Sequence, residues 1–301
     1  MKLEIDKIRE VGGLDFLAKQ LVEGFVTGLH KSPYHGFSVE FSEHQLYNTG
    51  QSTKNIDWKV FAKTDRLYTK RYEEETNLRC QIVIDNSSSM HYPQKSKGKI
   101  TFSIVAAAAL SYLLQKQRDA VGICAFSEAV EWMTPIKSTS NHLNKLLGQL
   151  EALLNTPSEE KSTNTGQILH EIANKTPRRS LIILFSDMLN NENDLDSIFT
   201  GLQHLKHKKH EVLLFHVTDN STELEFEFED RPHEFIDLES GERLKLQPAD
   251  IKQHYQSQAQ SFFKEVKMRC AKLKIDLIEA DINQDYNEIL KLYLVKRARM
   301  K

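Results

Sequence analysis

From residue 78 onward, short apolar runs alternate with longer stretches in which apolar positions recur at helical spacing. The short runs are bounded by polar or turn-forming residues, which is typical of buried strands, and the longer stretches are typical of amphipathic helices. The strands are expected at residues 80–84, 121–126, 130–133, 181–185, 212–217 and 275–278. The helices are expected at residues 100–117, 141–154, 167–174, 195–208, 262–273 and 286–297. This alternation predicts a mostly parallel sheet with helices on both faces.

The part of the chain before residue 78 has a different pattern. Apolar residues recur at helical spacing from Leu14 to Leu29, with charged residues on the other faces, which predicts an amphipathic helix. Alternating apolar and polar residues then indicate short strands at residues 37–41 and 67–72. Such a short region has little surface with which to cover the apolar face of its own helix. We therefore expect that residues 1–77 do not fold alone.

These patterns predict an α/β fold in two parts. Residues 78–301 are expected to form the sheet domain, and residues 1–77 a small N-terminal extension rich in helix and strand. Between residues 223 and 246 the pattern is that of a hairpin around Ser240 and Gly241, which is an insertion in the alternating scheme.

Composition and charge exclude several classes of protein. Apolar residues make up 40% of the chain and charged residues 27%, which is typical of a folded globular protein. Lys and Arg number 40 against 42 Asp and Glu, and because nucleic-acid binders are usually distinctly basic, we expect no nucleic-acid partner. Three cysteines suit a reducing compartment. The acidic start of the chain does not resemble a signal peptide, and the most apolar run, residues 104–110, is shorter than a bilayer span. We therefore expect a cytoplasmic protein without direct membrane insertion.

Short oxygen-bearing side chains follow the first expected strand of the sheet. Asp85, Ser87 and Ser89 have the spacing D-x-S-x-S directly after the apolar run 80–84. In an open α/β sheet, ligands bind beyond the carboxyl ends of the strands. Carboxylates and hydroxyls are hard ligands, so this segment suits Mg²⁺ or Mn²⁺ better than zinc. Taken alone, the motif also fits a polar loop with an Asx turn.

Two further oxygen clusters lie at the same expected edge of the sheet. Thr163 precedes the helix expected at 167–174, and Asp187 follows the strand at 181–185. Together with the first cluster, they resemble the metal-ion-dependent adhesion site of von Willebrand factor type A domains. The matching positions are Asp85, Ser87, Ser89, Thr163 and Asp187. The resemblance implies a Rossmann-like von Willebrand factor A fold, one divalent cation held by these residues, and an open coordination position that accepts an acidic residue of a partner.

The chain also resembles the domain of unknown function 58 family. The similar segments are residues 32–41, 55–59, 72–75 and 235–242, and Gln51 stands where that family usually has aspartate. Members of the family are bacterial and are often encoded beside a MoxR-type AAA+ ATPase. The resemblance therefore implies an adaptor or co-chaperone that works with such an ATPase on a protein client.

Two other functions compete with this interpretation. In the first, Asp85 is the nucleophile of a metal-dependent phosphoryl-transfer hydrolase. Hydrolases of the haloacid dehalogenase type need a second carboxylate two residues later as acid and base, and the chain has Ser87 there. The chain also has no phosphate-binding G-x-x-x-x-G-K-[ST] loop, so we expect a binding protein and not an enzyme. In the second, the chain is a scaffold whose site holds no metal.

Some reactive side chains have structural interpretations. His204, His207 and His210 could form a zinc site, but the lysines between them favour a solvated helix end. Trp58 could anchor a partner, although core packing is the commoner role of such a residue. Cys124 lies inside an apolar strand, which predicts a buried structural thiol.

Overall fold

The chain forms two compact units, one of residues Met1–Val26 and Leu78–Lys301, and one of residues Thr27–Asn77. We call them the sheet unit and the small unit. The computed structural model describes residues 13–29, 41–46, 58–72, 78–93, 98–155, 164–189, 195–238 and 241–299.

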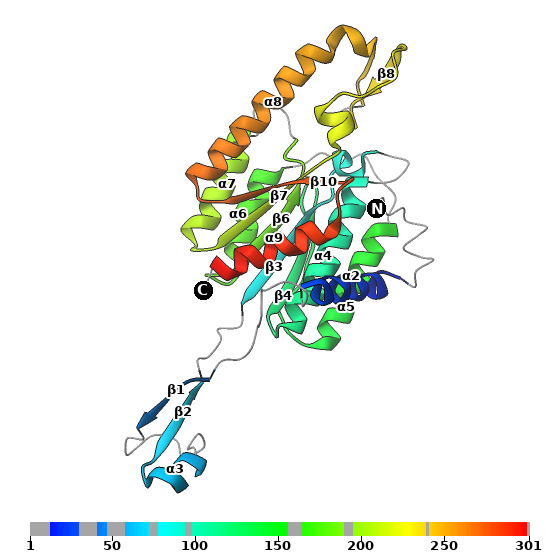
Figure 1. The fold of residues 1–301 in the computed structure, drawn as a ribbon. Coiled ribbons are helices and arrows are strands. Elements are labelled where there is room, and N and C mark those ends of the chain that lie inside the picture. Colours follow the sequence, from blue (N-terminus) through cyan, green and yellow to red (C-terminus); the bar gives the residue numbers. More distant parts are fainter. Residues whose placement is uncertain are drawn as a thin grey trace. The chain divides into compact units, whose positions relative to one another are not determined.

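A six-stranded sheet forms the centre of the sheet unit (Figure 1). Its strands are β3 (Arg79–Asp85), β4 (Ala120–Phe126), β5 (Val130–Met133), β6 (Leu181–Ser186), β7 (Glu211–Thr218) and β10 (Asp276–Asp281). They lie in the order β10-β7-β6-β3-β4-β5, and every pair is parallel except β4 with the edge strand β5. The order reverses between β3 and β6, which is the topological switch point of a doubly wound sheet. The predicted α/β fold, a mostly parallel sheet with helices on both faces, is confirmed.

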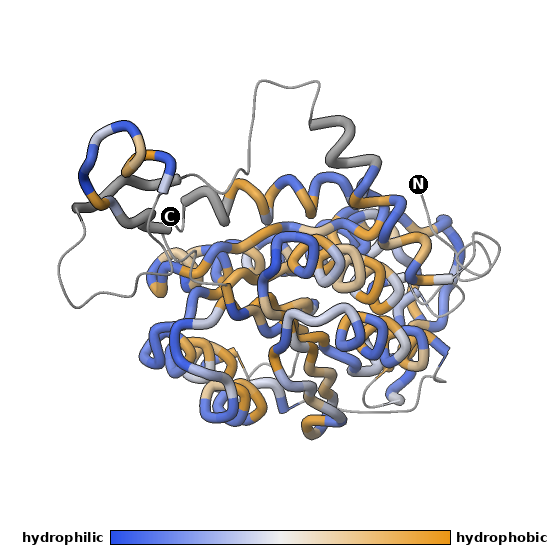
Figure 2. Tube along the Cα trace, turned by 90° about the horizontal axis from the view of Figure 1, so that it is seen from below, coloured by the Kyte–Doolittle hydropathy of each residue, from blue (hydrophilic) through white to orange (hydrophobic). Residues whose placement is uncertain are grey.

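Helices cover both faces of this sheet. One core cluster joins it to α2 (Leu14–Leu29), α4 (Gly98–Lys116), α5 (Ser140–Asn155) and α9 (Tyr286–Arg299). The other joins it to α6 (Thr165–Lys175), α7 (Leu195–His207) and α8 (Pro248–Lys272). Ile82 and Ile84 belong to the first cluster and Val83 to the second, because successive side chains of a strand point to opposite faces. Figure 2 shows apolar residues gathered along the strands and on the helix faces toward them.

Helix α4 is buried on nearly all sides. Of the described helices, it is the one long and apolar enough to cross a membrane, yet 83% of that apolar stretch is buried inside the fold. Small side chains from Ala106 to Ala109 let it lie close to the sheet. A helix that is apolar all round is expected in such a core position.

The helix of the N-terminal extension belongs in part to the sheet unit. Leu14, Leu17, Ala18 and Val22 are buried in the core cluster that also contains α4 and α5. The chain passes between the units after Asn77, where the sequence pattern also changes, and within α2 after Val26. The apolar stripe of α2 therefore has its partner in the sheet unit, which the local pattern alone did not indicate.

The small unit contains a two-stranded antiparallel sheet of β1 (Phe41–Leu46) and β2 (Tyr68–Tyr72), and the short helix α3 (Trp58–Thr64). The first strand starts where the expected strand at 37–41 ends, and residues 37–40 lie outside the described part. Trp58 is 62% exposed, and α3 has no buried residue. Within the described part of the small unit, Trp58 is therefore not a core side chain, contrary to the interpretation from the sequence.

The insertion after β7 begins with a turn of π-helix, η3 (Asn220–Leu224), and continues into the hairpin of β8 (His233–Ile236) and β9 (Arg243–Leu246). The ring of Phe226 packs 4.5 Å from that of Tyr255 on α8, which holds the insertion against that helix. Helix α8 begins at Pro248, well before the expected start at residue 262. Its first turns are mostly polar and show weak periodicity, so the sequence pattern does not indicate them.

Helices α6 and α7 cross closely through two glycines. A Cβ atom on Gly201 would lie 2.7 Å from the backbone oxygen of Gly166, and one on Gly166 would lie 2.1 Å from the Ser197 hydroxyl. Only glycine permits this approach. The crossing fixes the first turn of α6, which directly follows the segment that contains Thr163.

Candidate metal centre

The D-x-S-x-S segment lies where β3 ends and the short 3-10 helix η2 (Ser88–His91) begins. Asp85 is 2% exposed and Ser87 is fully buried. The Asp85 Oδ1 atom accepts a hydrogen bond from the backbone N–H of Ser87 at 3.0 Å. The hydroxyls of Ser87 and Ser89 are 3.1 Å apart. The two hydroxyls and the carboxylate of this motif thus lie together at the carboxyl edge of the sheet, as predicted.

Asp187 directly follows β6, the neighbour of β3 on the other side of the switch point. Ser186 joins the two strand ends, because its hydroxyl donates to Asp85 Oδ2 at 2.7 Å and accepts from the backbone N–H of Met188 at 3.0 Å. Asp187 Oδ1 in turn accepts from the N–H of Leu189 at 3.1 Å. The structure therefore brings together four of the five predicted ligands.

The fifth predicted ligand, Thr163, lies outside the described residues. The described chain resumes at Asn164, and α6 begins at Thr165. The assignment of Thr163 as a ligand stays a prediction.

The two aspartates interact electrostatically. Burial, together with the neighbouring Asp187 carboxylate, raises the pKa of Asp85 to about 7, although hydrogen bonds from Ser186 and Ser87 oppose the shift. A carboxylate that is buried next to a second one favours its neutral form unless a cation is present. The site therefore has the electrostatics of a cation-binding pair.

A buried lysine at the site was not anticipated from the sequence. Lys99, in the first turn of α4, is fully buried, and its ammonium lies 2.8 Å from Asp187 Oδ2 and 2.6 Å from Glu223 Oε1. Opposing the effect of burial, these two carboxylates raise the pKa of Lys99 well above its usual range, so it stays charged. Its signal in the sequence was its place at the start of a helix that is apolar all round.

The donors present fit a hard divalent cation. Asp85, Asp187, Ser87 and Ser89 offer carboxylate and hydroxyl oxygens, the ligands that suit Mg²⁺ and Mn²⁺. Lys99 carries one positive charge, and Asp85, Asp187 and Glu223 carry three negative charges when all are ionised. The net charge of the site is then −2. Among the described residues, no group of three or more His, Cys, Asp or Glu side chains is arranged to hold a metal; the candidate centre has two aspartates, and its other described donors are serine hydroxyls.

The other candidate side chains lie apart from this site. The Nδ1 atom of His204 is 2.9 Å from that of His170, whereas His210 is buried and its Nδ1 accepts from the N–H of Ser180 at 3.2 Å. His204 and His210 thus have different partners, and the histidines of this segment do not converge on one metal. Cys124 is fully buried and burial raises its pKa to about 12, which confirms an unreactive structural thiol.

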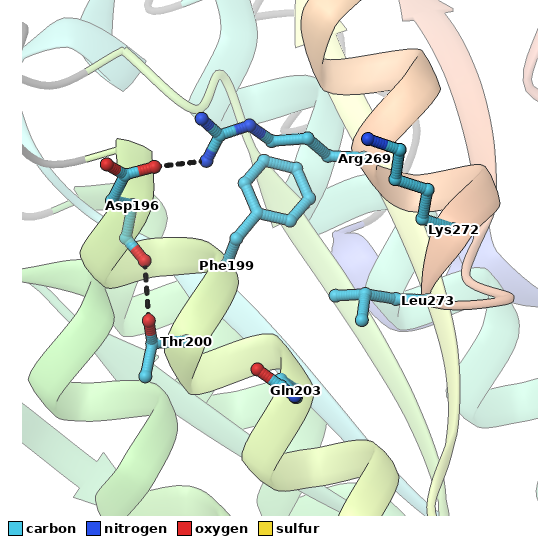
Figure 3. Close-up of a pocket in the computed structure, with 7 residues that line it drawn as sticks. All are labelled: Asp196, Phe199, Thr200, Gln203, Arg269, Lys272 and Leu273. Carbon is cyan, nitrogen blue, oxygen red and sulfur yellow. Dashed lines mark hydrogen bonds and ion pairs between the residues drawn. The ribbon is translucent and has the colours of Figure 1, made fainter.

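An open groove of about 320 Å³ lies between α7 and α8 (Figure 3). The guanidinium of Arg269 lies 5.3 Å from the centre of the Phe199 ring and forms an ion pair with Asp196. The polar groups drawn there are thus largely engaged with one another, and none of the predicted ligands lines the groove.

Comparison with known proteins gives remote relatives. Uncharacterized proteins of Mycobacterium bovis and Mycobacterium tuberculosis are each 22% identical to the chain over 206 residues. The match covers 68% of this chain and 63% of each relative, so the chain spans less than two thirds of their length.

Three solved structures illustrate the structural matches. BatB from Bacteroides thetaiotaomicron matches 74% of this chain and 99% of its own, with 12% identity and a TM-score of 0.42. An aerotolerance-related membrane protein from Bacteroides fragilis gives the same coverage with 14% identity and a TM-score of 0.44. Proximal thread matrix protein 1 of the mussel byssus, solved with zinc in its MIDAS motif, matches 47% of this chain and 38% of its own, with 16% identity and a TM-score of 0.37.

The family assignment rests on the match to a family model. The model of the family described as "Protein of unknown function DUF58" matches residues 43–263, which is more than half of the chain. The matched range includes all of the predicted ligands as well as Lys99 and Glu223. The chain therefore belongs to the DUF58 family.

Proposed function

We propose that this protein is a metal-dependent protein-interaction module. In this proposal Asp85, Ser87, Ser89 and Asp187, together with Thr163, hold one Mg²⁺ or Mn²⁺ ion. The observation that carries it is the meeting of two buried aspartates across the switch point. The hydroxyl of Ser186, the residue before Asp187, donates to Asp85, and two serine hydroxyls lie beside this carboxylate. Ligands bind at this edge of an open α/β sheet.

The residues of the site would have different roles in binding. When bound, the cation would supply an open coordination position for an acidic side chain of the partner, because Mg²⁺ takes six oxygen ligands and the five side chains leave room for another. Ser186 orients the Asp85 carboxylate through its hydrogen bond. Lys99 neutralises part of the charge on Asp187.

The partner that we propose is an AAA+ ATPase of MoxR type, for which this protein would serve as an adaptor or co-chaperone toward a protein client. Support comes from the membership in the DUF58 family and from the neighbourhood that the sequence resemblance implies. The proposal places both proteins in the cytoplasm, without nucleic acid and without direct membrane insertion.

The metal part of the proposal is tested by isothermal titration with Mn²⁺. We expect the wild-type chain to bind one ion and the Asp85→Ala, Asp187→Ala double variant to bind none. Ser111→Ala is the matched control, because it removes a buried hydroxyl on α4 that has no hydrogen-bond partner among the described residues. Binding heat that persists in the double variant would show that the ion sits elsewhere.

The partner part is tested by a binding titration against the ATPase. Loss of one side of a buried charged contact typically costs roughly 2–5 kcal/mol, or about 30-fold to several thousand-fold in affinity. EDTA and Thr163→Ala should each weaken the complex by at least the lower figure, with circular dichroism as the folding control. Undiminished affinity in EDTA would show that the metal takes no part in the contact. The exposed Trp58 of the small unit would then be the better candidate for the contact with the ATPase.

One observation favours an enzyme as the second candidate. A buried aspartate lies next to a lysine–aspartate pair, which is an arrangement that phosphoryl-transfer hydrolases also use. Against it, both oxygens of Asp85 already accept hydrogen bonds, and the position two residues later is Ser87. A chromogenic phosphate ester with Mg²⁺ tests it, because turnover that Asp85→Ala abolishes would establish the hydrolase.

A further inference from the structure

Lys99 is a charged side chain with no access to solvent. Its relative exposure is 0%, and its ammonium has carboxylate partners on two different elements. An ammonium is expensive to bury, so one in this position indicates a specific electrostatic role. The aromatic ring of Tyr92, with its centre 5.8 Å from Nζ, lines another side of the ammonium.

The two acceptors of Lys99 are themselves held in place. Asp187 Oδ1 accepts from the N–H of Leu189, which leaves Oδ2 for the ammonium. Glu223 Oε2 accepts from the N–H of Asp219 at 2.8 Å, which leaves Oε1 for the ammonium. Lys99 therefore connects the end of β6 with the η3 turn that opens the insertion, and neither carboxylate is free to turn away.

We infer that Lys99 is a resident counter-ion of the metal centre, which keeps the site assembled without metal and competes with the divalent cation for Asp187. The inference rests on the proposed metal-binding function and adds to it the residue that sets the affinity. An oxygen that already accepts from an ammonium at 2.8 Å is a weaker donor to a cation, and two cations that share one carboxylate repel each other. Loss of a group that supports a metal ligand from outside typically lowers metal affinity by about 10-fold to 100-fold. A competing ammonium acts on the same ligand with the opposite sign, so its removal should raise the affinity by a similar factor.

Three variants separate this local competition from the overall charge of the site. Lys99→Met removes the ammonium and makes the site more negative by one charge. Glu223→Gln makes it less negative by one charge and leaves Lys99 with Asp187 alone. The double variant Lys99→Met, Glu223→Gln has the same net charge as the wild type but no ammonium on Asp187, so it is the matched control.

The measurement is isothermal titration of the full chain with Mn²⁺, together with thermal unfolding in EDTA and in Mn²⁺. We expect Lys99→Met and the double variant to bind Mn²⁺ at least about 10-fold more tightly than the wild type, and Glu223→Gln to bind it more weakly. In EDTA, Lys99→Met should melt below the wild type, because two buried carboxylates then lack their counter-ion, and Mn²⁺ should restore more of its stability than it adds to the wild type. If Lys99→Met does not fold, the double variant carries the test, because it leaves no unpaired charge at Glu223.

The outcomes distinguish this inference from the proposed function. Wild-type affinity in the double variant would overturn the inference, since net charge alone would then set the affinity, and it would leave the metal-binding function standing. Binding in the double variant but none in the wild type would support the inference and overturn metal dependence for the native chain. No binding in any variant would overturn both.

Discussion

Replacing Ser186 with alanine should destabilise the sheet unit at the strand ends that carry the candidate metal centre. The Ser186 hydroxyl donates to Asp85 Oδ2 at 2.7 Å and accepts from the N–H of Met188 at 3.0 Å, and both contacts are buried. A hydrogen bond to a charged group contributes about 1.5–3 kcal/mol, and a buried N–H without a partner costs about 1–3 kcal/mol. Because one substitution removes both and the surroundings relax in part, we expect Ser186→Ala to lower the free energy of unfolding by about 2–4 kcal/mol.

Urea unfolding in EDTA, followed by circular dichroism at a pH above about 7 so that Asp85 is charged, measures this loss without a contribution from metal. Ser111→Ala removes the same atom from a buried position on α4 where the hydroxyl has no hydrogen-bond partner among the described residues, so it should cost less than about 1 kcal/mol. Mn²⁺ affinity should also fall in Ser186→Ala, because Asp85 loses the donor that orients it. A Ser186→Ala variant as stable as Ser111→Ala would refute the reasoning, since the hydroxyl would then not connect the strand ends.

Three further predictions concern the stability of the sheet unit. Gly201→Ala should destabilise the protein by about 1–3 kcal/mol through overpacking at the helix crossing. Gly148→Ala should be neutral or stabilising, because its added Cβ atom would have nothing within 4 Å. Equal urea midpoints for the two variants would contradict this. Leu17→Ala should cost about 2–5 kcal/mol because this side chain is buried in the core of the sheet unit, and Phe16→Ala, at a 50% exposed position, should cost less than about 1 kcal/mol. Burial lowers the pKa of His210, so the unfolded state binds the proton more tightly than the folded state. The protein should therefore lose stability as the pH falls below about 6.5. His210→Asn should make the free energy of unfolding depend less on pH in this range, and an unchanged dependence would contradict the assignment.

The predicted strands and helices of the sheet unit are present in the structure, and the edge strand β5 has the expected bounds of residues 130–133. This agreement has a physical reason. Strands that are buried on both faces need continuous apolar runs, and the helices that cover them need one apolar side, so the pattern is local. Where the pattern was weak, as in the polar first turns of α8, the bounds were missed.

The positions of two predicted ligands were also readable from the chain. Asp85 and Asp187 each follow an apolar strand directly, and the carboxyl ends of neighbouring parallel strands meet at one edge. The sequence by itself therefore determined which side chains reach that edge, although it did not show that β3 and β6 are neighbours. The register of these two strands and the reversal of strand order between them belong to the tertiary structure.

Only the tertiary structure decided what surrounds those ligands. Lys99 meets Asp187 and Glu223 across 88 and 124 residues of sequence, and no local pattern marks a lysine as the counter-ion of carboxylates so far away. The partner of the α2 stripe was equally hidden, because an amphipathic helix shows that it has an apolar side but not which surface covers it. Local periodicity follows from backbone geometry and can therefore be read from the sequence. Buried ion pairs and docking faces depend on how distant segments pack, so the sequence pattern does not show them.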